Sequence, residues 1–150
     1  MTVTVRAARP EDWSAVAALL VELGRGVAAG TAEDPTHRMQ FAGHLRRLDS
    51  VTLVAELDGD VVGVVDMEYH QRLGDHRPQA RVNDLVVSER VRREGVGTEL
   101  LGRAEVLARK RGCFRMALVT AAEARLAMTK SFSFSSVISF SKWVIRFRQA

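Results

Sequence analysis

Residues 85–101 read LVVSERVRREGVGTELL. The stretch predicts an apolar strand, a basic turn with two glycines and the start of an amphipathic helix. Gly95 and Gly97 let the backbone approach a ligand closely, because neither carries a Cβ. The first turn of a helix also presents N–H groups without helical partners and the positive end of the helix dipole. The stretch therefore predicts a phosphate-binding site.

Two common phosphate-binding designs do not fit these residues. A P-loop requires a lysine directly after its second glycine, and here Thr98 follows Gly97. A dinucleotide-binding fingerprint requires a third glycine three positions further on, where the chain has Leu100. A bare strand-to-helix turn stays as an alternative, although such a turn needs only one of the glycines and none of the surrounding arginines.

The composition is typical of a soluble globular protein. The 150 residues are enough for one domain with a sizeable core, and 47% are hydrophobic and 27% charged. No window approaches the roughly 18 uncharged apolar residues of a membrane span, and the N-terminus lacks the order of a signal peptide. The single cysteine, Cys113, fits a reducing compartment. We expect a cytoplasmic protein without a membrane partner.

The basic residues do not form a nucleic-acid-binding pattern. The net charge is +4, and the 22 basic residues, 19 of them arginines, are spread along the chain. A nucleic-acid-binding domain usually carries a denser stripe and more stacking rings than the 6% aromatic content here. We expect no nucleic-acid partner and keep such a domain only as a competing hypothesis. The assembly is left open, with a homodimer as one alternative.

Hydrophobic periodicity predicts alternating strands and helices. The clearest element is a hairpin, because Asp58-Gly59-Asp60 supplies a tight turn between two apolar strands. Strands are expected at 2–7, 51–57, 61–70, 80–87 and 114–120, and helices at 10–24, 36–48, 97–111 and 121–129. The second helix takes Met39, Phe41, Leu45 and Leu48 as its apolar set. This order indicates a mixed sheet with helices on its faces.

The C-terminal segment 129–150 differs from the rest of the chain. Residues 131–141 carry no charge, and serine alternates with large apolar residues, which favours an exposed strand. The shift away from Arg, Ala, Gly and Val raises the hypothesis of a diverged tail, or one read in another frame. We still expect residues 1–150 to form one domain.

The pattern Arg92-x-x-Gly95-x-Gly97, after an apolar strand and before a long helix, resembles the acetyl-CoA-binding motif of the GCN5-related N-acetyltransferase (GNAT) family. The Asp-Gly hairpin with Val61-Val62-Gly63 and the opening Arg9-Pro10-Glu11-Asp12 are also similar to that family, so the resemblance covers about residues 2–120. It implies a mixed, mostly antiparallel sheet of six to seven strands with flanking helices, splayed between 80–87 and 114–120.

The resemblance also implies a coenzyme site and an activity. The pantetheine arm of acetyl-CoA would pair with the backbone of one strand, and the pyrophosphate would lie on the amides of the turn, beside Arg92. The implied coenzyme-binding residues are Leu85, Val86, Val87, Arg92, Arg93, Glu94, Gly95, Val96, Gly97 and Thr98. The activity would be direct acetyl transfer to a primary amine of a small molecule or a peptide, without a metal.

Acetyl transfer needs a base, because only a neutral amine attacks the thioester. Asp84 lies where members of the family often carry a carboxylate, and we take it as the catalytic residue. Asn83 is an alternative match, and a plain ion pair of Asp84 with Arg81 or Arg115 is equally open. Asp66 and Glu68, two residues apart, share a strand face that could hold a cationic acceptor, with simple solvent exposure expected for at least one of them.

One expected feature is missing. Many members of the family place a tyrosine in the C-terminal region to protonate the thiolate, whereas the only tyrosine here is Tyr69, and Phe132 lies near the expected position. An acetyl-CoA-binding regulatory module with little or no catalysis is therefore the alternative function. His37 and His44 lack a third ligand for a metal, and Cys113 reads as a buried small side chain. The two tryptophans, Trp13 and Trp143, read as packing residues.

Overall fold

A computed structural model describes residues 2–22, 33–119, 136–139 and 142–146. Its strands are β1 (Val3–Ala7), β2 (Ser50–Leu57), β3 (Asp60–His70), β4 (Gln79–Val87), β5 (Arg115–Val119), β6 (Ser136–Ser139) and β7 (Lys142–Arg146). Its helices are α1 (Trp13–Glu22), α2 (Pro35–Leu45) and α3 (Val96–Lys110), with short 3-10 turns η1 (Pro10–Asp12) and η2 (Glu89–Val91). The helix expected at 121–129 lies outside the described residues.

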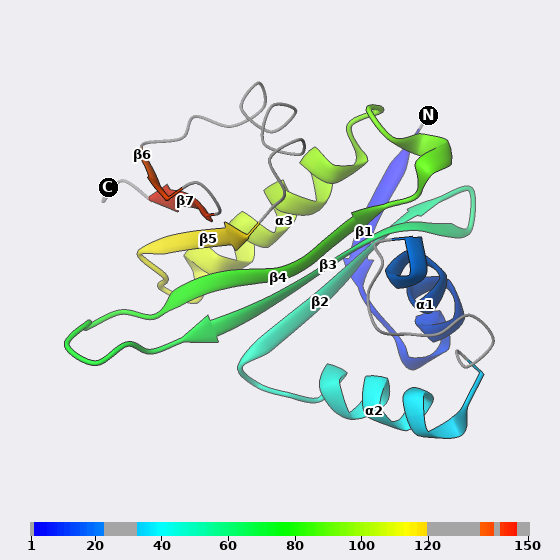
Figure 1. The fold of residues 1–150 in the computed structure, drawn as a ribbon, viewed down its shortest axis with the longest axis horizontal. Helices are drawn as coiled ribbons and strands as arrows, with labels where there is room; N and C mark the ends of the chain where they lie inside the picture. Colours follow the sequence, from blue (N-terminus) through cyan, green and yellow to red (C-terminus); the bar gives the residue numbers. More distant parts are fainter. Residues whose placement is uncertain (1, 23–32, 120–135, 140–141, 147–150) are drawn as a thin grey trace.

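The strands form one mixed sheet in the order β1-β2-β3-β4-β5-β7-β6. β4 and β5 run parallel, and the other paired strands are antiparallel. The predicted mixed sheet with flanking helices is therefore confirmed (Figure 1). Five strands lie before residue 120, and the expected count of six to seven is reached only with the two short strands β6 and β7 that follow.

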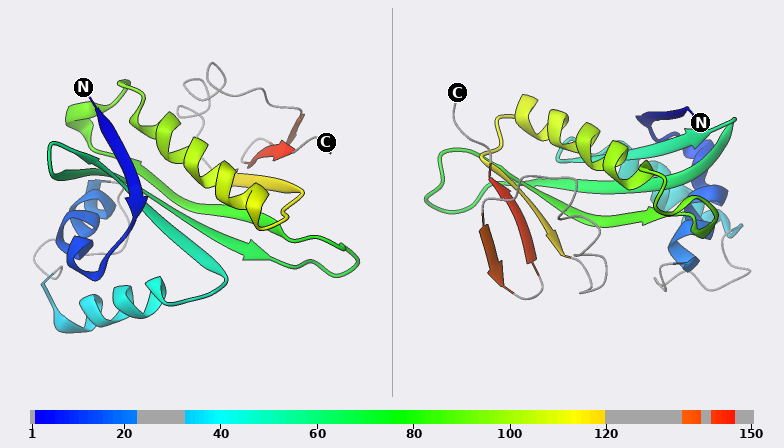
Figure 2. Two further views of the ribbon diagram at one scale, coloured as in Figure 1. Left: turned by 180° about the vertical axis from the view of Figure 1, so that it is seen from behind. Right: turned by 90° about the horizontal axis from the view of Figure 1, so that it is seen from above.

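The helices cover opposite faces of the sheet, as Figures 1 and 2 show. One apolar cluster joins α3 to the sheet through residues such as Val65, Leu100 and Met116. A second cluster joins α1 and α2 to the other face through Trp13, Phe41 and other residues. Two cores therefore lie on the two sides of one central sheet, and each face can carry a different part of a functional site.

The β2–β3 hairpin forms as predicted. Asp58 (φ 51°) and Gly59 (φ 85°) are both left-handed, and Leu57 pairs with Asp60 across the turn. Two residues with positive φ match the right-handed twist of the flanking strands. The Asp-Gly pair therefore fixes the register of the two central strands.

The prediction for the second helix was wrong at its C-terminal end. α2 ends at Leu45, so Leu48 lies beyond it and is 87% exposed. Met39 is also exposed. Residues two positions apart on a helix point in nearly opposite directions, and Phe41 faces the sheet. The buried side of α2 therefore rests on Phe41, with Leu45 four residues later beside it.

Candidate functional site

The turn between β4 and α3, at the predicted phosphate site, contains two residues with positive φ. Arg93 (φ 65°) and Gly95 (φ 88°) both have left-handed backbones, and Gly95 caps the helix. A turn of this kind followed by a helix start presents several amides to one side, as in anion-binding nests. Gly95 is required by its own φ, because a Cβ in this region is strained.

Gly97 serves a different purpose. A Cβ built at this position would lie 3.6 Å from Cγ2 of Val87, an ordinary contact, so packing inside the protein does not require glycine here. The missing side chain instead leaves the first turn of α3 open to a ligand. Thr98 and Glu94 beside it are exposed, whereas Val96 is buried under the turn.

Arg92 turns back onto the protein. Its Nε donates to the carbonyl of Val87 at 3.1 Å, and its terminal nitrogens lie 3.6 Å from Glu89 and 3.9 Å from Glu22. The side chain thus fastens the turn to the end of β4 and to α1. Its charge is shared with two carboxylates, and its predicted contact with phosphate stays a prediction.

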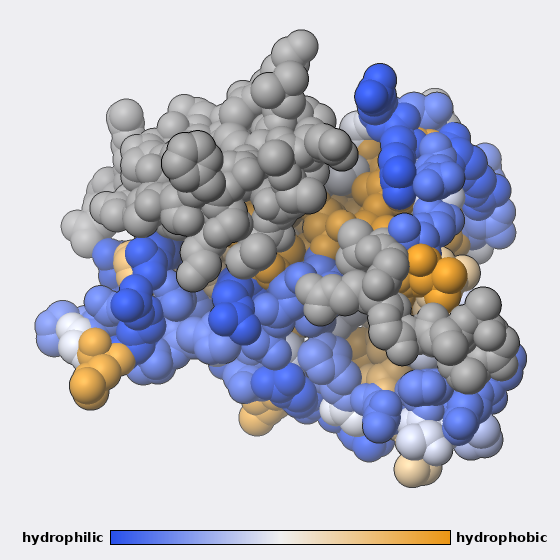
Figure 3. Space-filling view, viewed as in Figure 1, coloured by the Kyte–Doolittle hydropathy of each residue, from blue (hydrophilic) through white to orange (hydrophobic). Residues whose placement is uncertain are grey.

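The pairing of β4 with β5 is short. The two strands pair from Ala80 with Met116 to Val82 with Leu118, and β5 ends at Val119. The splay between 80–87 and 114–120 that the family resemblance implies stays a prediction. In the part of the chain that the structure describes, residues 85–87 pair with β3 on one side and with no strand on the other. Figure 3 shows apolar surface at the centre of this face, along the part of β4 that leads to the turn.

A β-bulge at Asn83 sets which face of the sheet Asp84 occupies. Asp66 pairs with Asp84 and Met67 with Val82, so Asn83 is an extra residue in β4. Val82 packs in the core beneath α3, whereas Asp84 lies on the face of α1 and α2. Residues two apart normally share a face, and the bulge breaks this rule.

Asp84 lies in a cavity of about 330 Å³ between α1, α2 and the sheet. Its apolar lining is Trp13, Val16, Leu20, Phe41 and Val64. Its polar lining is His37, Gln40, His44, Thr52, Asp66 and Asp84. Aromatic and aliphatic walls with a few convergent polar groups are typical of small-molecule sites.

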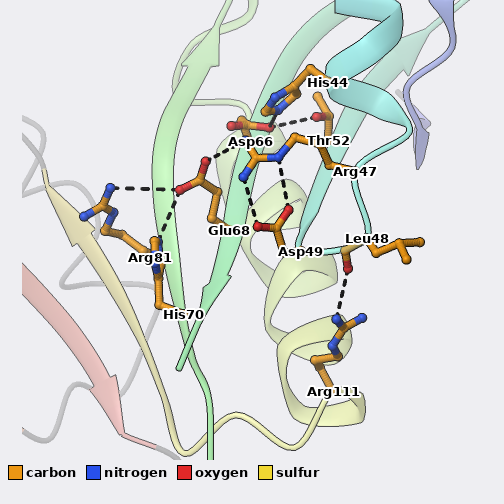
Figure 4. A network of polar contacts seen from close by, with 10 residues as sticks. All are labelled: His44, Arg47, Leu48, Asp49, Thr52, Asp66, Glu68, His70, Arg81 and Arg111. Atoms are coloured by element: carbon orange, nitrogen blue, oxygen red, sulfur yellow. Dashed lines mark hydrogen bonds and ion pairs between the residues drawn. The ribbon is translucent and has the colours of Figure 1, made fainter. Parts of the chain in front are cut away.

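A chain of hydrogen bonds crosses the cavity floor (Figure 4). Nε2 of His44 on α2 lies 2.7 Å from Oδ1 of Asp66 on β3, and the hydroxyl of Thr52 on β2 donates to the same oxygen at 2.8 Å. The Asp66 side chain is only 15% exposed. Asp66 is thus held in one orientation by two neighbouring elements.

Glu68 belongs to a separate basic network. Its carboxylate lies 3.2 Å from Arg47, 3.2 Å from His70 and 4.0 Å from Arg81 (Figure 4). A hydrogen bond from Asn83 is the main cause that lowers the pKa of Glu68, against the opposing effect of burial. The expected solvent exposure of Asp66 or Glu68 was wrong, because both are mostly buried and paired. Only Asp66 lines the cavity.

Asn83 and Arg115, the residues named in the alternative interpretations of Asp84, both form hydrogen bonds with other side chains. Asn83 forms one with Glu68 and accepts one from Nε of Arg81 at 3.0 Å, so its side chain has a structural role at the bulge. Arg115 donates to Gln79 at 2.8 Å. Asp84 itself is half-buried, and its Oδ1 is shielded from solvent.

Tyr69 and Cys113 lie away from the cavity, on the α3 side of the sheet. Burial raises the pKa of Tyr69, and the guanidinium of Arg111 lies over its ring at 4.7 Å. Burial also raises the pKa of the Cys113 thiol, and the side chain is only 4% exposed, so the prediction of a buried small residue is confirmed. Phe132 lies outside the described residues.

The sequence did not identify His44, Thr52, Trp13 and Phe41 as site residues. A signal was present for His44, because it follows Phe41 by three positions and shares its helix face. Nothing in the sequence alone places α2 over β3, so the pairing of His44 with Asp66 needs the fold. Among the described residues no three side chains form a cluster fit for a metal ion, and none of the described helices has the length and hydropathy to span a bilayer.

Comparisons with known proteins agree with this arrangement. Residues 13–134 match the sequence model of the Acetyltransferase (GNAT) family. No curated protein matches the chain.

Similar solved structures cover nearly the whole chain. The glucosamine-6-phosphate N-acetyltransferase of Arabidopsis thaliana has a TM-score of 0.75 and 19% identity over 93% of this chain and 97% of that one. The PaiA N-acetyltransferase of Thermoplasma acidophilum, in complex with coenzyme A, has a TM-score of 0.73 and 14% identity over 98% and 100%. A transcriptional regulator of Bacillus halodurans has a TM-score of 0.76 and 18% identity over 91% and 96%. At these identities the likeness is one of fold.

Proposed function

Since the chain belongs to the GNAT acetyltransferase family, we propose that it transfers the acetyl group of acetyl-CoA directly to a primary amine, with Asp84 as the base. The observation that carries the proposal is the position of β4. Its C-terminal end, at Val87, leads into the glycine turn, and Asp84, about 10 Å back along the strand, lies in the cavity. One strand thus joins a site for the donor to a site for the acceptor.

The donor site would hold acetyl-CoA by backbone contacts. The pyrophosphate would accept from the amides of Arg93 to Thr98, and the pantetheine arm would pair with the open edge of Leu85, Val86 and Val87. The observations that favour this fit are the positive φ of Gly95, the open first turn at Gly97 and the end of β5 pairing at Val82. A helix start favours a ligand of this negative charge.

The reaction would proceed without a covalent enzyme intermediate. Asp84 takes a proton from the bound ammonium, and the neutral nitrogen attacks the thioester carbonyl carbon. The C–N bond forms, the C–S bond breaks, and the second proton of the nitrogen goes to the departing sulfur. Tyr69 is packed against the core under α3, so no role in protonating the thiolate is assigned to it.

Calorimetry with acetyl-CoA tests the donor site. We expect a Kd in the micromolar range. Gly97→Trp should abolish binding, because the indole fills the open turn. The matched control is Gly102→Trp, five residues along the same helix, where nothing lies within 4 Å of a built Cβ. Equal loss of binding in both variants would contradict the assignment.

A thiol-release assay over a panel of primary amines tests the catalytic step. Asp84→Asn should lower kcat by about 10²–10⁴-fold, the usual contribution of a general base, and leave the Kd of acetyl-CoA unchanged. An unchanged kcat would remove Asp84 as the base. Coenzyme binding without turnover of any amine would instead favour a regulatory module, the alternative motivated by the absence of tyrosine after residue 69.

A further inference from the structure

The cavity beside Asp84 has an apolar wall that includes two aromatic rings. Trp13 and Phe41 lie with ring centroids 5.2 Å apart, and both are less than a tenth exposed. Val64, on the floor of the same cavity, is 2% exposed. These side chains give the cavity an apolar wall, and their packing holds that wall in place. The body of a bound ligand therefore faces rings and methyl groups.

The floor of the cavity carries a negative charge in an unusual arrangement. Asp66 and Asp84 are direct partners across β3 and β4, and both line the cavity. Like charges directly opposite each other destabilise a sheet. A positive charge held between them would offset this repulsion. His44 and Thr52 already fix the orientation of Asp66, so the floor is arranged before a ligand binds.

Anionic ligands do not match this lining. Among its described residues the cavity has no lysine or arginine, the side chains that form the strongest pairs with phosphate or carboxylate groups. The volume of about 330 Å³ is at the small end for ligand sites. A sugar phosphate and a peptide chain are therefore both poor occupants.

We propose that the acceptor is a small primary amine with an apolar body, of the arylalkylamine or branched alkylamine class, and with no anionic group. This inference rests on the proposed function and adds its substrate class. The ammonium lies between Asp66 and Asp84, and the body lies against Trp13 and Phe41. Amines that carry a carboxylate or phosphate near the nitrogen are excluded by the charge of the floor.

A matched amine series tests the class with the full chain and acetyl-CoA. Phenylethylamine has the aromatic body, phenylalanine adds a carboxylate to the same skeleton, and ethanolamine lacks the ring. We expect kcat/KM for phenylethylamine to exceed both others by about tenfold or more. Ethanolamine loses the binding energy of the buried ring, and the carboxylate of phenylalanine is repelled by the floor, and each effect lowers kcat/KM by at least that factor. Comparable or better turnover of phenylalanine, ethanolamine or glucosamine 6-phosphate would overturn the inference and leave the proposed function standing.

A charge placed at the rim gives a second test on the protein side. Gln40 is exposed and lines the cavity, so Gln40→Lys should raise the KM for phenylethylamine about threefold to tenfold without changing the Kd of acetyl-CoA. The control is Met39→Lys, which adds the same charge at a residue that is 72% exposed and does not line this cavity. Equal KM values for the two variants would contradict the inference.

A direct binding measurement distinguishes a wrong substrate class from an absence of catalysis. Calorimetry of phenylethylamine and phenylalanine with the coenzyme-loaded protein reports the occupant of the cavity whether or not transfer follows. Binding of phenylethylamine alone supports the substrate class, and binding of neither amine overturns it. Absence of turnover with every amine of the panel counts against the proposed function.

Discussion

Gly95 and Gly97 are two residues apart, and the structure gives each its own reason to be glycine. Gly95 has a φ of 88° and open space around it, so its constraint is conformational. Gly97 has an ordinary φ and a neighbour at 3.6 Å, so its constraint comes from the ligand we assign to the turn. We therefore expect Gly95 to affect the stability of the free protein and Gly97 to affect coenzyme binding.

Gly95→Ala is expected to lower the free energy of unfolding by about 1–2 kcal/mol, because an L-residue must adopt the left-handed backbone at the cap of α3. Gly102→Ala, inside the same helix with nothing within 4 Å of its Cβ, should raise it by about 0.5–1 kcal/mol. Chemical denaturation of the two variants checks both signs. A stabilised Gly95→Ala variant would show that the turn does not need its positive φ.

At the scale of elements, the sequence correctly predicted two turns and the end of α3, which depend on the residues at those positions. The Asp58-Gly59 turn, the β4–turn–α3 unit and the C-terminal end of α3 before Gly112 all follow from turn and cap residues, and the structure has them. The bulge at Asn83 and the placement of α2 do not follow from local patterns. The bulge depends on how many residues of β4 pair with β3, and the placement of α2 depends on which face of the helix packs on the sheet. The glycine turn was therefore predicted from the sequence, whereas most of the residues that line the cavity were not.

The approach of α3 to the sheet depends on Gly63 in β3. A Cβ there would lie 2.9 Å from Cδ1 of Leu100 and 3.3 Å from both the Val86 carbonyl and Cγ1 of Val96. Gly63→Ala should lower the free energy of unfolding by about 1–3 kcal/mol, because the start of α3 has to move outward. Gly43→Ala is the control, since α2 has space at that position. Equal stability of the Gly63→Ala variant and the parent protein in urea would show that α3 tolerates the shift.

At the scale of the whole molecule, the two faces of the sheet carry different helices and different parts of the proposed site. The core under α3 supports the start of the helix to which we assign the donor site, while α1 and α2 enclose the cavity on the opposite face. β4 is common to both. A substitution on one face should therefore leave binding at the other unchanged, which is why Gly97 and Gln40 serve as separate probes.

The N-terminal corner ties the edge of the sheet to the first helix through one carboxylate. Asp12 accepts two hydrogen bonds from Arg6, at 2.8 and 2.9 Å, and one from the Arg9 amide at 2.7 Å, while Arg6 also reaches Glu56. The hydrogen bond with Arg6 is the main cause that holds the pKa of Asp12 below its usual range. Its stabilising effect is thus fully present above the pKa of the unfolded chain and is lost as the pH falls through the folded value.

Asp12→Asn should lower the free energy of unfolding by about 1–2 kcal/mol at pH 7. The difference from the parent protein should shrink as the pH falls below about 4, because the carboxyl of the unfolded chain takes up a proton there before the native carboxyl does. Urea denaturation between pH 7 and pH 3.5 measures it. Asp58→Asn, on an exposed turn with a backbone that asparagine also adopts, should be near the parent at pH 7. A difference for Asp12→Asn that does not change with pH would contradict the assignment.

The extra residue in β4 also has a consequence for how this protein can change over time. Asn83 is the extra residue, so its deletion would leave Val82 and Asp84 as sequence neighbours on opposite faces, as in a regular strand. Asp84 would keep its place opposite Asp66. Two descendants that differ by the single codon of residue 83 could therefore carry the same acid in the cavity, while only one of them keeps the amide that binds Glu68.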